Sequence, residues 1–129
     1  MMRGLTLAAA LLLLVHGLIH LMGMTVYMRL GEIDGMEYRT TLLDGRWEVG
    51  DGWIRVYGAL WGLAAIGFSA ATAGWMTGWE PWRAVLVAVA LVSLVLTVLD
   101  WRNAFLGAGI NVVILALVWL APRLSAIQG

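Results

Sequence analysis

Four long apolar segments alternate with polar stretches along the chain, and charged residues are nearly absent from them. An α-helix rises about 1.5 Å per residue, so about 20 apolar residues cross the roughly 30 Å hydrocarbon core of a bilayer. The pattern predicts an all-α membrane protein, an up-down bundle of four transmembrane helices in one domain, residues 1–129. The predicted helices cover residues 5–28, 54–76, 84–99 and 102–120.

Polar and helix-breaking residues mark the ends of these segments. Gly78 and Pro81 separate the second segment from the third. The third and fourth together are about twice as long as one crossing requires, so the polar LDWRN between them predicts a tight helical hairpin. Asp100 is the expected N-cap of the fourth helix, with its carboxylate accepting a hydrogen bond from the amide of Asn103.

The first segment begins like a signal peptide, with Met1, Met2 and Arg3 ahead of LTLAAALLLLV. The apolar run then continues through HGLIHLMGMTVYM to Met28, and no small-x-small cleavage signal follows the apolar stretch. We therefore expect this segment to be retained as the first transmembrane helix.

The charge distribution gives two opposite indications of orientation. Five of the eight arginines fall on the side of the loop at residues 29–53, and the positive-inside rule counts such residues. The same side carries seven of the eight acids, with which these arginines are expected to pair. We therefore expect both termini at the cytoplasmic face of the inner (plasma) membrane.

The polar loop at residues 29–53 contains a hairpin signal. In TTLLDGRWEV, the pair Asp44-Gly45 lies between two short runs of strand-forming residues. Asp-Gly favours such turns because both positions take a positive φ. The sequence predicts a small two-stranded flap that packs on the mouth of the bundle through Leu42, Leu43, Trp47 or Val49.

Composition narrows the classes of function. Hydrophobic residues make up 62% of the chain and charged residues only 12%, so the lipid bilayer is the expected solvent. The eight arginines balance the eight acids, and the chain has no lysine. The sequence therefore offers no basic surface for nucleic acid. The chain has no cysteine, which excludes disulfides, thiol nucleophiles and thiolate metal sites.

Both histidines of the chain lie in the first apolar segment, in HGLIHLMG. His16 and His20 are four residues apart, so they share one face of a helix, and Tyr27 continues that face. On the fourth segment Asp100, Asn103 and Asn111 form a second polar stripe with Gly107. If the two helices are antiparallel neighbours, the predicted pairs are His16 with Asn111, His20 with Gly107, Met24 with Asn103, and Tyr27 with Asp100.

Polar groups inside a bilayer face the protein interior and need partners. Two interpretations stay open for the histidines: hydrogen bonds that hold helices together, or a ligand or proton site. Haem would need a second axial ligand from a methionine or from another protomer, because both histidines occupy one face of one helix. Zinc lacks a third ligand nearby. A chain from His16 through His20 and Tyr27 to Asp100 would suit a proton relay or a quinone head group.

Other small and hydroxyl-bearing residues predict helix packing. Gly58 and Gly62 have a GxxxG-like spacing, which lets helix backbones approach closely. Ser69, Ser93 and Thr97 have no adjacent base in the sequence, and we expect their hydroxyls to bond to the backbone of their own helix.

The segments HGLIHLMG, LLDGRWEVGDGWIRVYGALWGLAAIGF and LDWRNAFLGAGINVVILAL occur in an order that resembles small bacterial four-helix membrane proteins of uncharacterised function. These proteins are similar in architecture to DoxX-type proteins and often carry a transporter permease label. The resemblance implies the fold and no mechanism. The positions it marks are His16, Gly17, His20, Gly23, Gly45, Arg46, Trp47, Arg55, Asp100, Gly107 and Asn111.

Together these features predict a non-catalytic binding or accessory component with a polar site inside the membrane, between the first and fourth helices. One alternative is a membrane redox subunit that binds haem or quinone. Another is a transporter component that works as a homo-oligomer, and a partner membrane protein is a further expectation. The candidate site residues are His16, His20, Tyr27, Asp100, Asn103 and Asn111.

Overall fold

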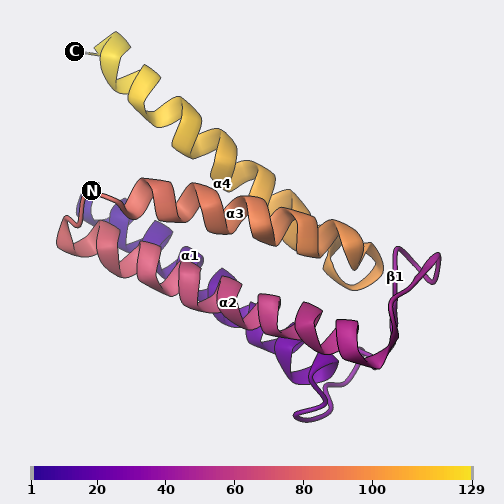
Figure 1. Cartoon of the computed structure of the whole chain (residues 1–129). Helices are drawn as coiled ribbons and strands as arrows, with labels where there is room; N and C mark the ends of the chain where they lie inside the picture. Colours follow the sequence, from indigo (N-terminus) through magenta and orange to yellow (C-terminus); the bar gives the residue numbers. More distant parts are fainter. Residues whose placement is uncertain (1, 129) are drawn as a thin grey trace.

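The structure, a computed structural model, describes residues 2–128, and side chains for residues 3–123. It confirms the predicted all-α four-helix bundle, and all four helices are long and apolar enough to cross a membrane. Both termini lie at one end of the bundle and the loop lies at the other (Figure 1). The elements are α1 (Met2–Tyr27), β1 (Thr41–Leu42), β2 (Trp47–Glu48), α2 (Gly50–Thr77), α3 (Trp82–Leu99) and α4 (Trp101–Gln128).

All four helices are longer than the sequence pattern predicts, and α2 and α4 differ most. Helix α2 begins at Gly50 rather than at residue 54. The carboxylate of Asp51 in its first turn interacts favourably with the positive end of the helix dipole. Helix α4 continues past residue 120 to Gln128, with Pro122 inside it. A proline removes one backbone hydrogen bond but does not have to end a helix.

Each helix packs on the next one in the sequence, α1 on α2, α2 on α3, and α3 on α4. Glycines allow the close contact between α1 and α2. A Cβ on Gly17 would lie 2.6 Å from the Cβ of Phe68, and a Cβ on Gly62 would lie 2.4 Å from the Sδ of Met24. The predicted packing role of Gly58 is also confirmed, because a Cβ there would meet Met28 at 2.8 Å.

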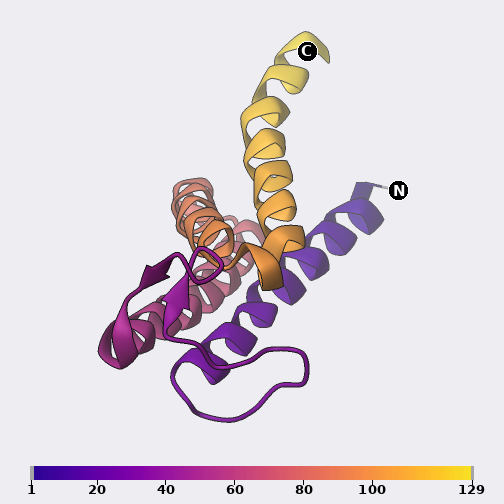
Figure 2. The same cartoon turned by 90° about the vertical axis from the view of Figure 1, so that its right-hand side faces the viewer.

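Helix α4 leaves the bundle as it runs toward the C-terminus. Figure 2 shows α4 near α1 at its start and well separated from it at the other end. Ala104, in the first turn of α4, has a non-helical backbone (φ −129°, ψ 17°), which bends the helix at this point. Within residues 2–128, α1 and α4 have no extensive backbone contact. We call the region where these two helices face each other the α1/α4 seam.

The predicted hairpin is present in the loop. Strands β1 and β2 pair antiparallel, with Thr41 opposite Glu48 and Leu42 opposite Trp47. The turn between them includes Asp44 and Gly45, and both have positive φ as expected. Of the residues expected to pack on the bundle, Leu42 is buried, whereas Trp47 is exposed.

Two contacts fasten the tip of the hairpin to the corner between α3 and α4. The backbone N–H of Leu43 donates to the carbonyl of Leu99 at 2.9 Å. Arg102 forms an ion pair with Asp44 at 2.8 Å. The flap therefore lies over the loop end of the bundle, as predicted.

Candidate functional site

Four polar residues from three helices form a closed ring of hydrogen bonds inside the bundle. His20 Nδ1 donates to the backbone carbonyl of His16 at 2.8 Å, and His20 Nε2 accepts from the Ser93 hydroxyl at 2.5 Å. Ser93 Oγ accepts from the Asn111 side-chain amide at 2.7 Å. Asn111 Oδ1 then accepts from His16 Nε2 at 3.1 Å. We call these four residues the polar ring.

The direction of every bond in the polar ring follows from one carbonyl. The backbone oxygen of His16 only accepts, so His20 Nδ1 must carry the proton, and a neutral His20 then offers Nε2 as an acceptor. The Ser93 hydroxyl fills that acceptor and in turn receives the amide N–H of Asn111. All four bonds of the polar ring are therefore satisfied with a neutral His20. Apart from His16 Nδ1, the side-chain nitrogen and oxygen atoms of the ring have partners at a depth where hydrocarbon offers none.

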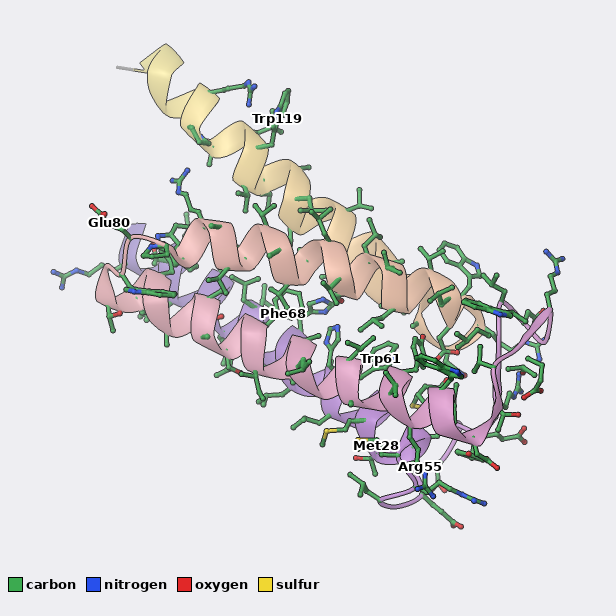
Figure 3. The ribbon with its side chains drawn as sticks, viewed as in Figure 1. Met28, Arg55, Trp61, Phe68, Glu80 and Trp119 are labelled. Atoms are coloured by element: carbon green, nitrogen blue, oxygen red, sulfur yellow. The ribbon has the colours of Figure 1, made fainter. Side chains whose placement is uncertain are left out.

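Aromatic rings from α2 enclose the histidines. The ring of Phe68 lies 4.9 Å from that of His16, and the ring of Trp61 lies 5.1 Å from that of His20. Figure 3 labels Trp61 and Phe68, which extend from α2 into the interior of the bundle. Ser93 and Asn111 have no exposed surface. The polar ring is therefore packed on all sides by protein.

This packing limits the chemistry that the polar ring supports. Ser93 beside His20 has the arrangement of a nucleophile and its base, but both are buried, and the hydroxyl has no open side toward a substrate. Axial binding of haem through either Nε2 would break the ring. No group of three potential metal-ligating side chains occurs in the part of the chain that the structure describes. His16 Nδ1 is the one imidazole nitrogen for which residues 3–123 show no hydrogen bond.

The remaining predicted site residues meet at the loop end of the bundle. The hydroxyl of Tyr27 donates a short hydrogen bond to the carboxylate of Asp100. The side-chain amide of Asn103 donates to the other oxygen of that carboxylate at 3.1 Å. Burial raises the pKa of the Asp100 carboxyl, although both hydrogen bonds act in the opposite direction.

The predicted N-cap geometry of Asp100 is wrong in one respect. Its backbone carbonyl, and not its carboxylate, accepts from the backbone N–H of Asn103 at 3.0 Å. The carboxylate instead turns toward α1, where Tyr27 is its partner. A contact between helices has replaced the local cap.

The predicted pairing of α1 with α4 holds at two of four levels. His16 meets Asn111, and Tyr27 meets Asp100. The two pairs between them are wrong: His20 bonds to Ser93 of α3, and Met24 packs on Gly62 of α2. The two helices have no extensive backbone contact, and hydrogen bonds from His16 to Asn111 and from Tyr27 to Asp100 bridge the α1/α4 seam.

Ser93 was predicted to bond to its own helix, and this prediction is wrong because it belongs to the polar ring. Thr97 does bond back to the carbonyl of Ser93 at 2.8 Å, and Ser69 bonds back to Ala65 at 2.8 Å. A signal for Ser93 exists in the sequence. It falls on the stripe of α3 that also carries Leu86, Ala90 and Thr97, which is the buried face of that helix.

A cavity of about 970 Å³ lies at the loop end, between the end of α1 and the start of α4. We call it the mouth cavity. Asn103 is the one predicted site residue that lines it, whereas Tyr27 and Asp100 line a hollow of about 10 Å³ beside it. Its apolar lining is Val26, Leu30, Ile33 and Met36, and its charged lining is Arg29, Arg39, Arg102, Glu32, Asp34 and Glu37.

The arginines of the mouth cavity differ in their partners. Arg102 is paired with Asp44 at 2.8 Å, and Arg39 lies 3.5 Å from Glu37 in an exposed pair. The guanidinium of Arg29 lies over the ring of Tyr38, 4.4 Å from its centroid. No carboxylate within residues 3–123 forms an ion pair with Arg29. Its charge and donors are therefore available to a ligand.

Comparisons with known proteins do not extend this picture. No family model matches the chain, and neither the curated proteins nor the solved structures give a match. The resemblance to DoxX-type proteins stays a prediction.

Proposed function

We propose that the protein is a non-catalytic binding component of a membrane that holds the polar head of an amphipathic molecule in the mouth cavity. The observation that carries this proposal is the cavity itself, about 970 Å³ in volume, at the level where α1 ends and α4 begins. Its lining combines four apolar side chains with three arginines, three carboxylates and the Asn103 amide. Ligand sites typically combine an apolar wall with a few polar groups that orient the ligand.

The α1/α4 seam gives the apolar part of such a molecule a place. The mouth cavity is lined from both helices, by Val26 and Arg29 at the end of α1 and by Arg102 and Asn103 at the start of α4. Below it the two helices have no extensive backbone contact. An acyl or isoprenoid chain attached to a head in the cavity would continue along the seam, facing both protein and lipid.

The donors around the mouth cavity favour a head that is rich in acceptor oxygens. Arg29 offers a guanidinium without a carboxylate partner, and planar guanidinium groups suit phosphate oxygens. The amide of Asn103 suits a phosphate or a carbonyl equally well. A phospholipid head and a quinone head share this chemistry, and the experiment below separates them.

The other expectations receive different support. Haem binding gains no support from His20, since both nitrogens of that imidazole already have partners. Quinone binding belongs within the proposed site, at the mouth cavity. A homo-oligomeric transporter, a partner membrane protein, and termini at the cytoplasmic face of the inner membrane stay predictions.

Photo-crosslinking in lipid nanodiscs tests the proposal. The protein is reconstituted with a phospholipid that carries a diazirine near its phosphate, or with a diazirine-bearing isoprenoid quinone, and the labelled peptides are mapped. We expect labelling at residues 26–39 and 102–103, reduced at least fivefold in the double variant Arg29→Ala/Asn103→Ala. The matched control is Arg83→Ala, because Arg83 lies near the start of α3 at the opposite end of the bundle.

The two probes separate the possible heads. Labelling by the phospholipid alone identifies a phosphate site, and labelling by the quinone alone identifies a carbonyl site. Labelling that is spread evenly over the lipid-facing helices, or that is unchanged in the double variant, would overturn the proposal.

A further inference from the structure

We infer that α4 is a lateral gate on the α1/α4 seam, with its hinge at Ala104 and its latch at Asn111 in the polar ring. The inference rests on the proposed function, because the seam is the place assigned to the apolar chain of the ligand. The inference adds a mechanism by which the seam opens and closes. Three observations support it: the hydrogen bonds that fasten α4, the position at which the helix bends, and the packing that holds the rest of the helix.

The latch is a single side chain. Asn111 is the residue of α4 that enters the polar ring, where it accepts from His16 of α1 and donates to Ser93 of α3. The side chain is completely buried. Because the ring closes only when the Asn111 amide lies between His16 and Ser93, it specifies one position of α4 against both neighbours.

The hinge lies between the two fastened levels of α4. Asp100, bound to Tyr27, comes just before the helix, and Asn111 comes ten residues into it. Ala104 stands between them, with the non-helical φ of −129°. A rotation of α4 about Ala104 therefore leaves the contact of Asp100 with Tyr27 intact and moves only the part that Asn111 fastens.

A further support of α4 within residues 3–123 is its packing on α3, where Gly107 lies against Thr97, and Ala108 and Ile114 of α4 are buried. Apolar packing inside a bilayer has no hydrophobic driving force, because lipid chains are equally apolar. Such apolar contacts allow α4 to slide on α3, whereas the hydrogen bonds of Asn111 hold α4 in one position. Within residues 3–123, Asn111 of α4 and Asp100 just before it are the residues whose hydrogen bonds to side chains of α1 the structure shows.

The distance of a residue from Ala104 sets how far that residue moves when α4 rotates. Leu117 lies thirteen residues beyond Ala104, about 20 Å along the helix, and Leu106 lies about 3 Å beyond it. A rotation of about 10° about Ala104 would move Leu117 by roughly 3 Å and Leu106 by roughly 0.5 Å. Movement that grows with distance from Ala104 distinguishes a hinged gate from a general loosening of the bundle.

Pulsed electron paramagnetic resonance in nanodiscs measures this motion. The chain has no cysteine, so spin labels attach only to introduced pairs at exposed positions. The far pair is Leu12→Cys/Leu117→Cys across the seam, and the near pair is Met22→Cys/Leu106→Cys. The reference pair is Leu12→Cys/Leu91→Cys, which joins α1 to α3.

Each pair is recorded with the natural residue at position 111 and in Asn111→Leu, which removes the latch but keeps the branching of the side chain. Ser69→Ala is the matched control, since Ser69 bonds only to its own helix. We expect Asn111→Leu to lengthen or broaden the far distance by at least 3 Å, with a change below 1 Å in the near and reference pairs. If Asn111→Leu does not fold, Asn111→Gln takes its place, because glutamine keeps the amide but displaces it. We expect a smaller lengthening or broadening of the far distance in Asn111→Gln.

An unchanged far distance in a folded latch variant would overturn the gate, and so would equal changes in all three pairs. Photo-crosslinking at the mouth cavity is recorded on the same variants. Persistent labelling with unchanged distances would refute the gate alone. Absent labelling in the natural protein, with α4 still moving in Asn111→Leu, would refute the proposed function and leave the hinge.

Discussion

Replacing Ser93 by alanine should destabilise the protein far more than replacing any other serine of the described helices. Ser93 Oγ is bonded on one side to His20 at 2.5 Å and on the other to Asn111 at 2.7 Å, without exposed surface. Ser93→Ala removes both bonds and leaves an imidazole acceptor and an amide donor without partners. No water reaches this depth to replace the lost hydroxyl.

Two estimates bound the loss of stability expected for Ser93→Ala. Hydrogen bonds between transmembrane helices average about 0.6 kcal/mol, with a maximum of about 1.7 kcal/mol, so two bonds give about 1 to 3 kcal/mol. Unsatisfied buried groups cost about 1 to 3 kcal/mol each in proteins generally, which favours the upper part of that range. We expect Ser93→Ala to lower the free energy of unfolding by about 2 kcal/mol.

The assay is reversible unfolding in mixed micelles by increasing mole fractions of sodium dodecyl sulfate, followed by circular dichroism and tryptophan fluorescence. Ser69→Ala is the matched control, because its hydroxyl bonds only to the carbonyl of Ala65, and we expect a change within about 0.5 kcal/mol. A double-mutant cycle of Ser93→Ala with Asn111→Leu should be strongly non-additive, since either change opens the same polar ring. Equal effects of Ser93→Ala and Ser69→Ala, or additivity in the cycle, would refute the closed ring.

Gly17→Ala should lower stability by about 1 to 3 kcal/mol, because its Cβ would lie 2.6 Å from the rigid Cβ of Phe68. Gly62→Ala is its matched control and should cost under about 1 kcal/mol, since the flexible end of Met24 can move away; equal losses in the same unfolding assay would contradict this packing. Because burial raises the pKa of Asp100, the folded state binds a proton more readily than the unfolded state, so stability should fall as pH rises through the interval between the two pKa values. Asp100→Asn should flatten this part of the stability profile measured against pH, and a persistent slope would assign it to another group.

The sequence predicted the helices because their signal is local. Twenty apolar residues cross a bilayer whatever their neighbours do, so the pattern alone determined four spans. The hairpin was likewise predictable, since Asp44 and Gly45 both take the positive φ that their residue types favour. The extent of α4 beyond residue 120 and the start of α2 at Gly50 depart most from this local pattern.

The candidate site was predictable only where side chains reach across helices in register. Counting residues along α1 and α4 identified the contact of His16 with Asn111 and that of Tyr27 with Asp100. It failed for His20, because the spacing of residues on two helices says nothing about a third helix lying beside them. Ser93 was therefore missed, although the periodicity of α3 places it on the buried face.

The mouth cavity had no sequence signal at all. Its wall includes residues 29–39, which follow neither a helical nor an alternating pattern. The path of such a segment depends on tertiary contacts such as the stacking of Arg29 on Tyr38. Sequence reasoning consequently placed the ligand beside the histidines, whereas the structure has a cavity of about 970 Å³ at the loop end.

Native mass spectrometry of the protein released from nanodiscs tests the central claim most directly. The nanodiscs contain a defined phospholipid and an isoprenoid quinone in equal amounts, and bound molecules are counted for each chain. We predict one retained amphiphile per chain in the natural protein and in Arg83→Ala, and at least a fivefold lower occupancy in Arg29→Ala/Asn103→Ala. Retention that is equal in all three proteins, or no retention in the natural protein, would contradict a head-group site in the mouth cavity.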